Sequence, residues 1–375
     1  TTLIEEATTQ PTATAQPAAA TGLPTAPPAP SDTPSLTATQ KPTTTPESQS
    51  ATPATTPTHS STSTLTPNPT RTPSRVPTSA SVRPTATPSL SGRIYFPVYD
   101  PNPDRRTYDI HVVDLASGDR EIMLGQASQP ALSPSGGRLA YRSWDIHSRG
   151  IRVRELSDEN TWEWIGFHEA EHPSWSPDNL SLAFSSQQEI DRNWRLYRTR
   201  GLDIERVERE GGDIYGRVPA WSMDGRLVYW ECPLGGCGLY ATRPDGTGST
   251  RLTTGEHDTA PAVSPNGREI AFMSSRDGDW EIYVVGANPT GPDLEEPRQL
   301  TTNGSSDGLP AWSPNGKWIA FASNRGGTWA IWAMRPDGSG SRKLFELGGP
   351  LMGEVANVPP TEQHGWTWEA IAWGE

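Results

Sequence analysis

The sequence predicts an all-β fold: a six-bladed β-propeller of four-stranded antiparallel blades, preceded by an extended segment of low complexity. Three observations predict it. A short proline-led phrase recurs five times at intervals of 42 to 49 residues, each copy is followed by turns and alternating apolar strands, and all 15 Trp lie after residue 90. Repeats of this length, each reading as four short strands, are typical of propeller blades.

The first 90 residues have a composition that cannot bury a core. They contain 26 Thr, 17 Pro, 13 Ala and 11 Ser, and no Trp, Tyr, Phe or Cys. Such a chain stays extended in water, because proline favours polyproline II and little apolar surface is present to drive collapse. We therefore place a Thr/Pro/Ser/Ala-rich stalk or linker at 1–92 and the propeller at 93–375.

Thr-Pro and Ser/Thr clusters recur along this stalk, a composition typical of O-glycosylated, mucin-like stalks. An unmodified disordered linker is the alternative. The apolar pair Leu3-Ile4 interrupts this composition, which suggests a membrane-proximal or partner-bound segment, and self-association through the N-terminal segment is a further hypothesis. The candidate glycan acceptors are Thr43, Thr44, Thr45, Thr52, Thr55, Thr56 and Thr58.

The recurring phrase marks the first strand of each blade. Its copies are Pro130-Ala-Leu-Ser-Pro134, Pro173-Ser-Trp-Ser-Pro177, Pro219-Ala-Trp-Ser-Met223, Pro261-Ala-Val-Ser-Pro265 and Pro310-Ala-Trp-Ser-Pro314. A turn such as Asn266-Gly267 follows each copy, and an apolar strand comes next. We expect these second strands at 138–141, 181–184, 226–229, 269–272 and 317–321.

Two further strands complete each repeat. The stretches 280–285 and 329–334 alternate with a period of two, which indicates pleated backbone. Pro-Asp-Gly turns at 244–246 and 336–338 then lead into a short fourth strand. An array of helices is the competing repeat architecture, but glycine and proline every 8–12 residues would interrupt helices of useful length.

The ends of the propeller complement each other. Residues 93–124 supply a second, third and fourth strand without a first, whereas 366–373 supply a first strand without a complete blade after it. Pairing the two closes a ring of six blades and removes the exposed sheet edges. A seventh, damaged blade built on 371–373 is the alternative.

Three phrases carry a resemblance to a known family. Residues 310–321 (PAWSPNGKWIAF), 274–283 (SSRDGDWEIY) and 244–253 (PDGTGSTRLT) resemble the TolB-type, WD-like propeller repeat. The resemblance covers most of 93–375 and implies a six-bladed propeller that acts as a binding platform outside the cytoplasm. The Thr/Pro/Ser-rich stalk stands where that family has an N-terminal α/β domain.

Charge and hydropathy exclude some partners. The stalk carries as many acids as bases, so the formal net charge of −13 belongs to the propeller, and a nucleic-acid partner is not expected. No stretch is long and apolar enough to span a membrane. Because the chain opens at Thr1, we expect that a signal peptide or an anchor was removed or lies upstream.

The two cysteines, Cys232 and Cys237, lie in the run Cys-Pro-Leu-Gly-Gly-Cys, whose proline and glycines allow a short loop to bring the thiols together. A local disulfide is predicted. Two thiols alone do not complete a zinc site, so no metal and no cofactor are predicted.

Loops that enter the first strands converge near the axis of a propeller, so their polar residues are candidates for a binding funnel. The funnel would be acidic and would bind a cation or a basic peptide segment; polar loop ends that simply face water are the alternative. The candidates are Glu169, His172, His257, Asp258 and Asp307.

The pattern Gly304-Ser-Ser-Asp-Gly308 matches the nucleophile elbow of α/β-hydrolases, but a strand of the repeat follows it where that elbow needs a helix. We therefore predict no enzyme. The expected function is protein or glycan recognition, or surface assembly, by a cell-surface or secreted propeller on its stalk. The alternatives are a structural subunit of a glycosylated appendage or filament, and a lyase or hydrolase acting in the axial funnel.

Overall fold

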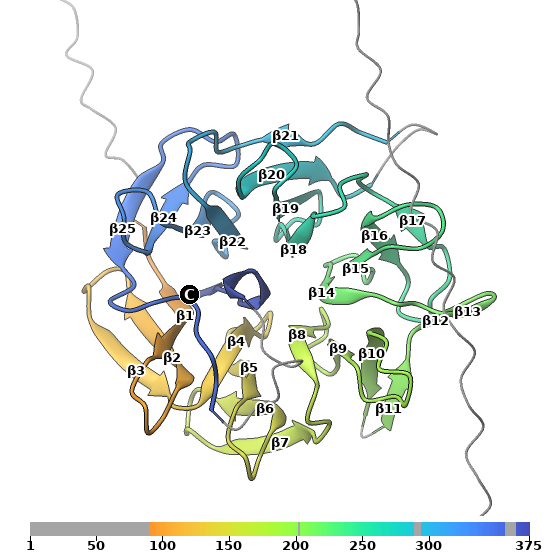
Figure 1. The fold of residues 1–375 in the computed structure, drawn as a ribbon, viewed down its shortest axis with the longest axis horizontal. Coiled ribbons are helices and arrows are strands. Elements are labelled where there is room, and N and C mark those ends of the chain that lie inside the picture. Colours follow the sequence, from red (N-terminus) through yellow and green to blue (C-terminus); the bar gives the residue numbers. More distant parts are fainter. Residues whose placement is uncertain (1–89, 202, 289–293, 357–364) are drawn as a thin grey trace, which may run out of the picture. The chain divides into compact units, whose positions relative to one another are not determined.

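The computed structural model describes residues 90–375 apart from residues 202, 289–293 and 357–364. Residues 1–89 of the stalk, with its seven candidate acceptor threonines, lie outside the described residues. Within them, six four-stranded antiparallel sheets follow one another around a ring (Figure 1), so the predicted six-bladed propeller is confirmed.

Blades 2 to 4 each run from the axis outward in chain order. Blade 2 consists of β4 (Ala127–Leu132), β5 (Arg138–Ser143), β6 (Gly150–Glu155) and β7 (Thr161–Ile165). Blade 3 consists of β8 (Glu171–Trp175), β9 (Leu182–Ser186), β10 (Arg195–Arg200) and β11 (Asp203–Arg206). Blade 4 consists of β14 (Arg217–Trp221), β15 (Leu227–Glu231), β16 (Gly238–Thr242) and β17 (Thr250–Arg251). A two-stranded ribbon of β12 (Glu208–Arg209) and β13 (Gly212–Asp213), which the repeat did not predict, connects blades 3 and 4.

Blades 5 and 6 follow the same order. Blade 5 consists of β18 (Thr259–Val263), β19 (Glu269–Ser274), β20 (Glu281–Gly286) and β21 (Arg298–Gln299). Blade 6 consists of β22 (Asp307–Trp312), β23 (Ile319–Ser323), β24 (Ala330–Met334) and β25 (Arg342–Glu346).

Blade 1 combines the two ends of the propeller. Its outer strands are β1 (Arg93–Asp100), β2 (Thr107–Asp114) and β3 (Arg120–Leu124), and its innermost strand is β26 (Ala372–Gly374), which pairs antiparallel with β1. The closure is therefore as predicted, and no seventh blade is built on 371–373. One expectation was wrong in detail: residues Trp366–Trp368 form a 3-10 helix, η2, and only Ala372 and Trp373 of the expected strand, together with Gly374, pair with β1.

In four of the five copies the serine of the repeat phrase stabilises the sharp turn after the first strand, whereas in blade 4 the Ser222 hydroxyl accepts no such bond from the described residues. In blade 5 the Ser264 hydroxyl accepts a hydrogen bond from the backbone N–H of Glu269 at 2.9 Å, and in blade 6 Ser313 accepts one from Trp318 at 3.0 Å. A side chain that bonds backbone groups a few residues away stabilises a turn in this way.

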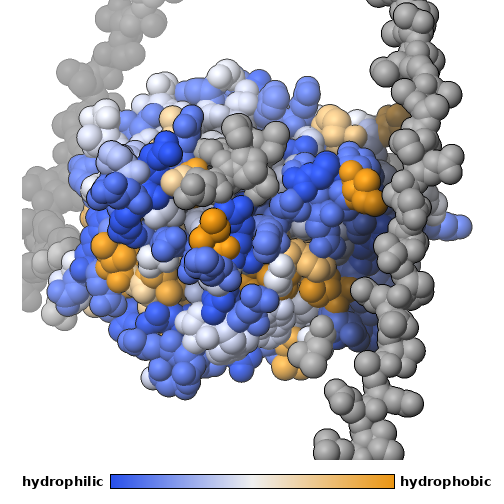
Figure 2. Space-filling view, turned by 60° about the horizontal axis from the view of Figure 1, so that its bottom comes forward, coloured by the Kyte–Doolittle hydropathy of each residue, from blue (hydrophilic) through white to orange (hydrophobic). Residues whose placement is uncertain are grey.

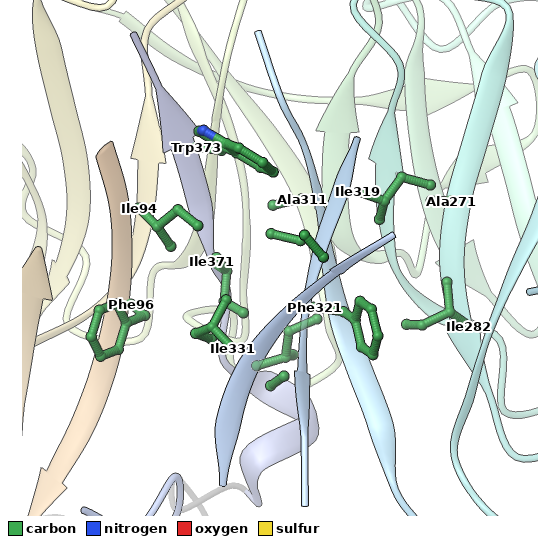
Figure 3. Packing of buried hydrophobic residues seen from close by; sticks show 14 of the residues in the cluster. Ile94, Phe96, Ala271, Ile282, Ala311, Ile319, Phe321, Ile331, Ile371 and Trp373 are labelled. Carbon is green, nitrogen blue, oxygen red and sulfur yellow. The ribbon is translucent and has the colours of Figure 1, made fainter. Parts of the chain in front are cut away.

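In blades 3 and 6 the tryptophan of the phrase joins the blade to the preceding one. The Trp312 indole donates to the carbonyl of Ala262 in the preceding blade at 2.9 Å, and the Trp175 indole donates to Ala131 at 3.1 Å. Apolar side chains fill the space between the sheets, and Figure 3 shows such a cluster where blades 5 and 6 meet the closing blade 1. Each fully buried Ile or Phe there stabilises the fold by about 2 kcal/mol.

Candidate functional site

The innermost strands of all six blades surround an axial pocket of about 540 Å³. Its walls are the repeat prolines, the alanines that follow four of them and the tryptophans of the repeat phrase. Apolar residues occupy these positions because each inner strand packs against its own blade on one side and faces the axis on the other. A concave, mostly apolar recess of this size is the usual form of a ligand site.

The residue before each repeat proline adopts a left-handed backbone conformation. Its φ lies between 48° and 56° in all five copies, and the strand register shifts at the same place in each blade. A residue that bulges from an inner strand turns its side chain away from the regular alternation. All five of these residues line the pocket: Gln129, His172, Val218, Ala260 and Leu309.

The helix η2 closes one end of the pocket. In Figure 1 it lies inside the ring of inner strands. Trp366 packs against Trp329 and Trp280, with ring centroids 4.8 and 6.2 Å away, and Trp368 packs against His172 and Trp194, each at 5.5 Å. The chain thus carries its own aromatic plug at the axis.

A hydrogen-bonded polar floor lies where the plug meets blades 2 and 3. The Gln129 amide nitrogen donates to the Trp368 carbonyl at 2.9 Å, and its amide oxygen accepts from the His172 backbone N–H at 2.8 Å. The backbone N–H of Gln129 donates to Glu369 at 3.3 Å. Burial raises the pKa of Glu369 to about 8, against the smaller lowering effects of Ser128 and Arg142. Glu369 is therefore mainly protonated at neutral pH.

A buried ion pair lies behind this floor. Arg142 of β5 is fully buried and pairs with Glu171 of β8, and its guanidinium lies 3.9 Å from the centroid of the Trp144 ring. An ion pair with this little access to water holds blades 2 and 3 in one geometry and costs much free energy if one partner is removed.

The five residues predicted to form a funnel do not come together. Asp258 and Asp307 are completely buried. Arg276 donates to both carboxylate oxygens of Asp258, at 2.7 and 2.8 Å, and Arg325 pairs with Asp307. Both pairs lie within their own blades, so these carboxylates support the starts of the inner strands.

The other three candidates lie in separate surroundings. Glu169 pairs with Arg192 on the loop between β9 and β10, and His257 is exposed. His172 is buried and is the one member of the predicted funnel that lines the axial pocket. Binding by the five as a set stays a prediction, and the structure gives them no common centre.

Cys232 and Cys237 are joined by a disulfide in the loop between β15 and β16, so the predicted local disulfide is present.

The described residues contain no group of three His, Cys, Asp or Glu side chains that could hold a metal ion. No helix among them has the length and apolarity that crossing a bilayer requires. In the Gly304–Gly308 stretch, Asp307 opens β22, so the described chain continues there as a propeller strand.

Comparison with known proteins places the repeat in a family. Residues 255–350 match the family described as the TolB beta propeller domain. The repeat is of the TolB type. The Protein TolB homolog of Chlorobium luteolum is 32% identical over 114 residues, which are 30% of this chain and 26% of that protein. The chain thus matches about a quarter of the length of this TolB relative.

Solved structures agree on the fold. TolB from Acinetobacter baumannii superposes with a TM-score of 0.61 at 21% identity, over 76% of this chain and 67% of that chain. Hydrazine synthase from Kuenenia stuttgartiensis, an enzyme, superposes with a TM-score of 0.54 at 10% identity, over 76% of this chain and 47% of that chain. At these identities only the TolB-like fold is shared, and the fold alone does not separate binding proteins from enzymes.

Sequence reasoning missed Gln129, Arg142, Glu171, Arg217 and Glu369. A signal for two of them was present. Two residues before the repeat proline, three copies have the small residues Ser128, Thr259 and Gly308, whereas the other two have Glu171 and Arg217. A charged residue at an inner-strand position where the other blades have a small residue indicates a role that the repeat itself does not require. Nothing comparable pointed to Glu369, whose place depends on the plug.

Proposed function

We propose that the chain is a non-enzymatic propeller that recognises a protein partner through its axial pocket, at the cell surface or in a secreted form. The TolB-type repeat supports a protein-interaction propeller. The observation that carries the proposal is the axial pocket itself, a recess of about 540 Å³ walled by prolines, alanines and tryptophan edges.

The end of the pocket opposite η2 supports an approach by a protein segment. Its rim consists of exposed residues on the turns after the inner strands, among them Pro134, Pro265 and Met223, which is 50% exposed. Hydrophobic residues lie as separate spots among hydrophilic ones on the face in Figure 2, so a partner would find its contiguous apolar contact in a recess. An apolar side chain or tight turn suits such walls better than a glycan, which needs many polar partners.

The ionisable groups of the pocket favour binding over turnover. Among the described lining residues they are His172 and Glu369, which take part in the floor, and Glu375 at the rim. The enzymatic alternative, a lyase or hydrolase in the funnel, would require Asp258 and Asp307, which are committed to arginines. Replacing both by Ala in such an enzyme would abolish turnover, whereas a binding protein would lose stability.

The test uses site-specific photo-crosslinking on the full chain. A photoreactive residue at Met223 should crosslink to one protein in an extract of the native surface, whereas the same residue at Ile122, which is 60% exposed on the outer strand β3, should not. Filling the pocket with Ala220→Trp should abolish the Met223 crosslink while circular dichroism stays unchanged. Equal crosslinking from both positions, or binding of a glycan array that Ala220→Trp abolishes, would contradict the proposal.

We also propose that residues 1–92 act as a glycosylated stalk that displays the propeller. The composition of the stalk supports this. Intact mass before and after chemical release of O-linked sugars should show a heterogeneous excess that maps to the stalk. The rival proposal, an appendage subunit, predicts concentration-dependent polymers in light scattering, whereas a recognition module stays monomeric.

A further inference from the structure

Arg217, the first residue of β14, lies inside a cage of three indoles next to the plug. The carbon of its guanidinium is 5.5 Å from the ring centroid of Trp194, 5.1 Å from that of Trp230 and 5.3 Å from that of Trp368. The three rings come from blade 3, blade 4 and η2, so the cage forms only in the closed propeller. We call Arg217 with these three tryptophans the arginine cage.

The guanidinium has no hydrogen bond and no ion pair with any described residue. Its Nε is buried without a partner, whereas its two terminal nitrogens keep some access to solvent. Burial lowers the pKa of Arg217. The neighbouring carboxylate of Glu231 does not serve it, because Arg209 donates to both Glu231 oxygens at 2.6 and 3.0 Å.

Several other buried or half-buried arginines of the described chain have carboxylate partners. Arg142 pairs with Glu171, Arg195 with Asp191 and Asp213, and Arg276 with Asp258. The faces of the indole rings attract the guanidinium cation. They offer no acceptor to its N–H groups, which point outward in the plane of the guanidinium. A donor deprived of both water and a partner costs free energy, so an acceptor supplied from outside would stabilise this site.

The cage is also held in place before any ligand arrives. The Trp230 indole donates to the Glu256 carbonyl at 2.9 Å, and the rings of Trp194 and Trp368 pack against each other at 5.5 Å. A rigid site loses little conformational entropy when a ligand binds.

We propose that the arginine cage binds one carboxylate of a protein partner, an Asp or Glu side chain that enters between the indoles and accepts both terminal N–H groups of Arg217. A single guanidinium offers a fork that matches a carboxylate, whereas a phosphate-rich ligand would need several cations and would be repelled by the charge of −13. The indoles would cover the methylene groups of the acidic side chain. The identification of the partner as a protein rests on the proposed function.

The test measures binding of a small carboxylate probe to the full chain. The probe is N-acetyl-glutamate α-amide, and its neutral counterpart is N-acetyl-glutamine α-amide; the readout is the indole N–H resonances, assigned by single Trp→Phe variants. The resonances of Trp194, Trp230 and Trp368 should shift saturably with the glutamate probe below about 50 mM, and binding of the glutamine probe should be about tenfold weaker or more.

Arg217→Gln should weaken the glutamate probe by about tenfold or more, whereas Arg200→Gln, the same change at a side chain that is 75% exposed, should leave binding within about twofold. If Arg217→Gln does not fold, Arg217→Lys keeps the charge without the fork and should still weaken the probe at an unchanged melting temperature. Equal shifts with both probes, unchanged binding in both Arg217 variants, or tighter binding of inorganic phosphate would overturn the proposal. Loss of the Met223 crosslink with an intact probe site would instead count against the proposed function alone.

Discussion

Five residues with side chains of different kinds share one unusual backbone conformation at the axis. Gln129, His172, Val218, Ala260 and Leu309 all have φ near +50°, a region that costs a non-glycine residue about 1 kcal/mol or more. Five blades share this free-energy cost, and in each of them the left-handed residue lines the pocket. We infer that the bulge shapes the axial lining.

Ala260→Gly should therefore be neutral or stabilise the protein by up to about 1 kcal/mol, because glycine adopts φ of +48° without strain. Ala262→Gly, two residues further along the same strand and similarly half-buried, should destabilise it by about 1 kcal/mol. Urea unfolding of both variants measures the difference. A larger loss for Ala260→Gly than for Ala262→Gly would show that the left-handed position is not strained.

Glu369 makes stability depend on pH in an unusual direction. Its pKa rises from an ordinary value of 4.5 to about 8 in the folded chain, so between these values the folded state holds a proton that the unfolded state has released. The contribution of this group to the free energy of unfolding therefore falls as the pH rises from about 4.5 to 8, and is constant outside that window.

Glu369→Gln should flatten this fall, because an amide keeps a hydrogen-bonding side chain without an ionisable proton. The measurement is the urea midpoint at several pH values between 5 and 8.5. Glu121→Gln, an exposed change on β3, should keep the wild-type dependence of the urea midpoint on pH. An unchanged slope in Glu369→Gln would mean that another group, such as Glu281, whose pKa burial raises to about 7, is responsible.

The inner strands of blades 5 and 6 begin with the same device. A buried aspartate at the strand start pairs with an arginine that follows the second strand: Asp258 with Arg276, and Asp307 with Arg325. The arginines also lie over aromatic rings, Arg276 at 4.9 Å from Tyr283 and Arg325 at 4.5 Å from Trp332. Each pair therefore ties three strands of one blade together.

Asp258→Asn should destabilise the protein by about 3 kcal/mol, because it leaves the arginine without its counter-charge. In the double variant with Arg276→Met the loss should be smaller than the sum of the two single losses. Thermal unfolding of the four proteins gives the coupling energy. Strict additivity would show that the pair does not act as a unit, and the loop acids would again be candidates for binding.

For the molecule as a whole, the sequence predicted the architecture well and the axis poorly. The spacing of the Pro-x-x-Ser phrase implied four strands per blade, and the incomplete ends implied that 366–373 and 93–124 share a blade. Both inferences depend on local patterns. The burial of Asp258 and Asp307 depends on arginines 18 residues away, and the plug depends on how residues from η2 meet the inner strands of five other sheets. No spacing along the chain encodes such contacts.

Ring closure itself can be tested at Trp373. This side chain is 7% exposed in the core shared by blades 1, 5 and 6, and its indole donates to the Ser91 carbonyl at 3.1 Å. Trp373→Ala should destabilise the propeller by about 3–5 kcal/mol. Trp162→Ala, on the outer strand β7, should cost much less. If calorimetry shows equal losses, the closing strand is no more important than an outer one.

The pairing of β26 with β1 also has a consequence for synthesis on the ribosome. About 280 residues separate the two strands, and at 5–20 residues per second the inner edge of β1 waits roughly 15 to 55 s for its partner. During that interval five blades can assemble while the first keeps an open, hydrogen-bonding edge. The nascent chain is thus most exposed to pairing with a neighbouring copy just before β26 emerges, and a chaperone that covers β1 would protect it at that stage.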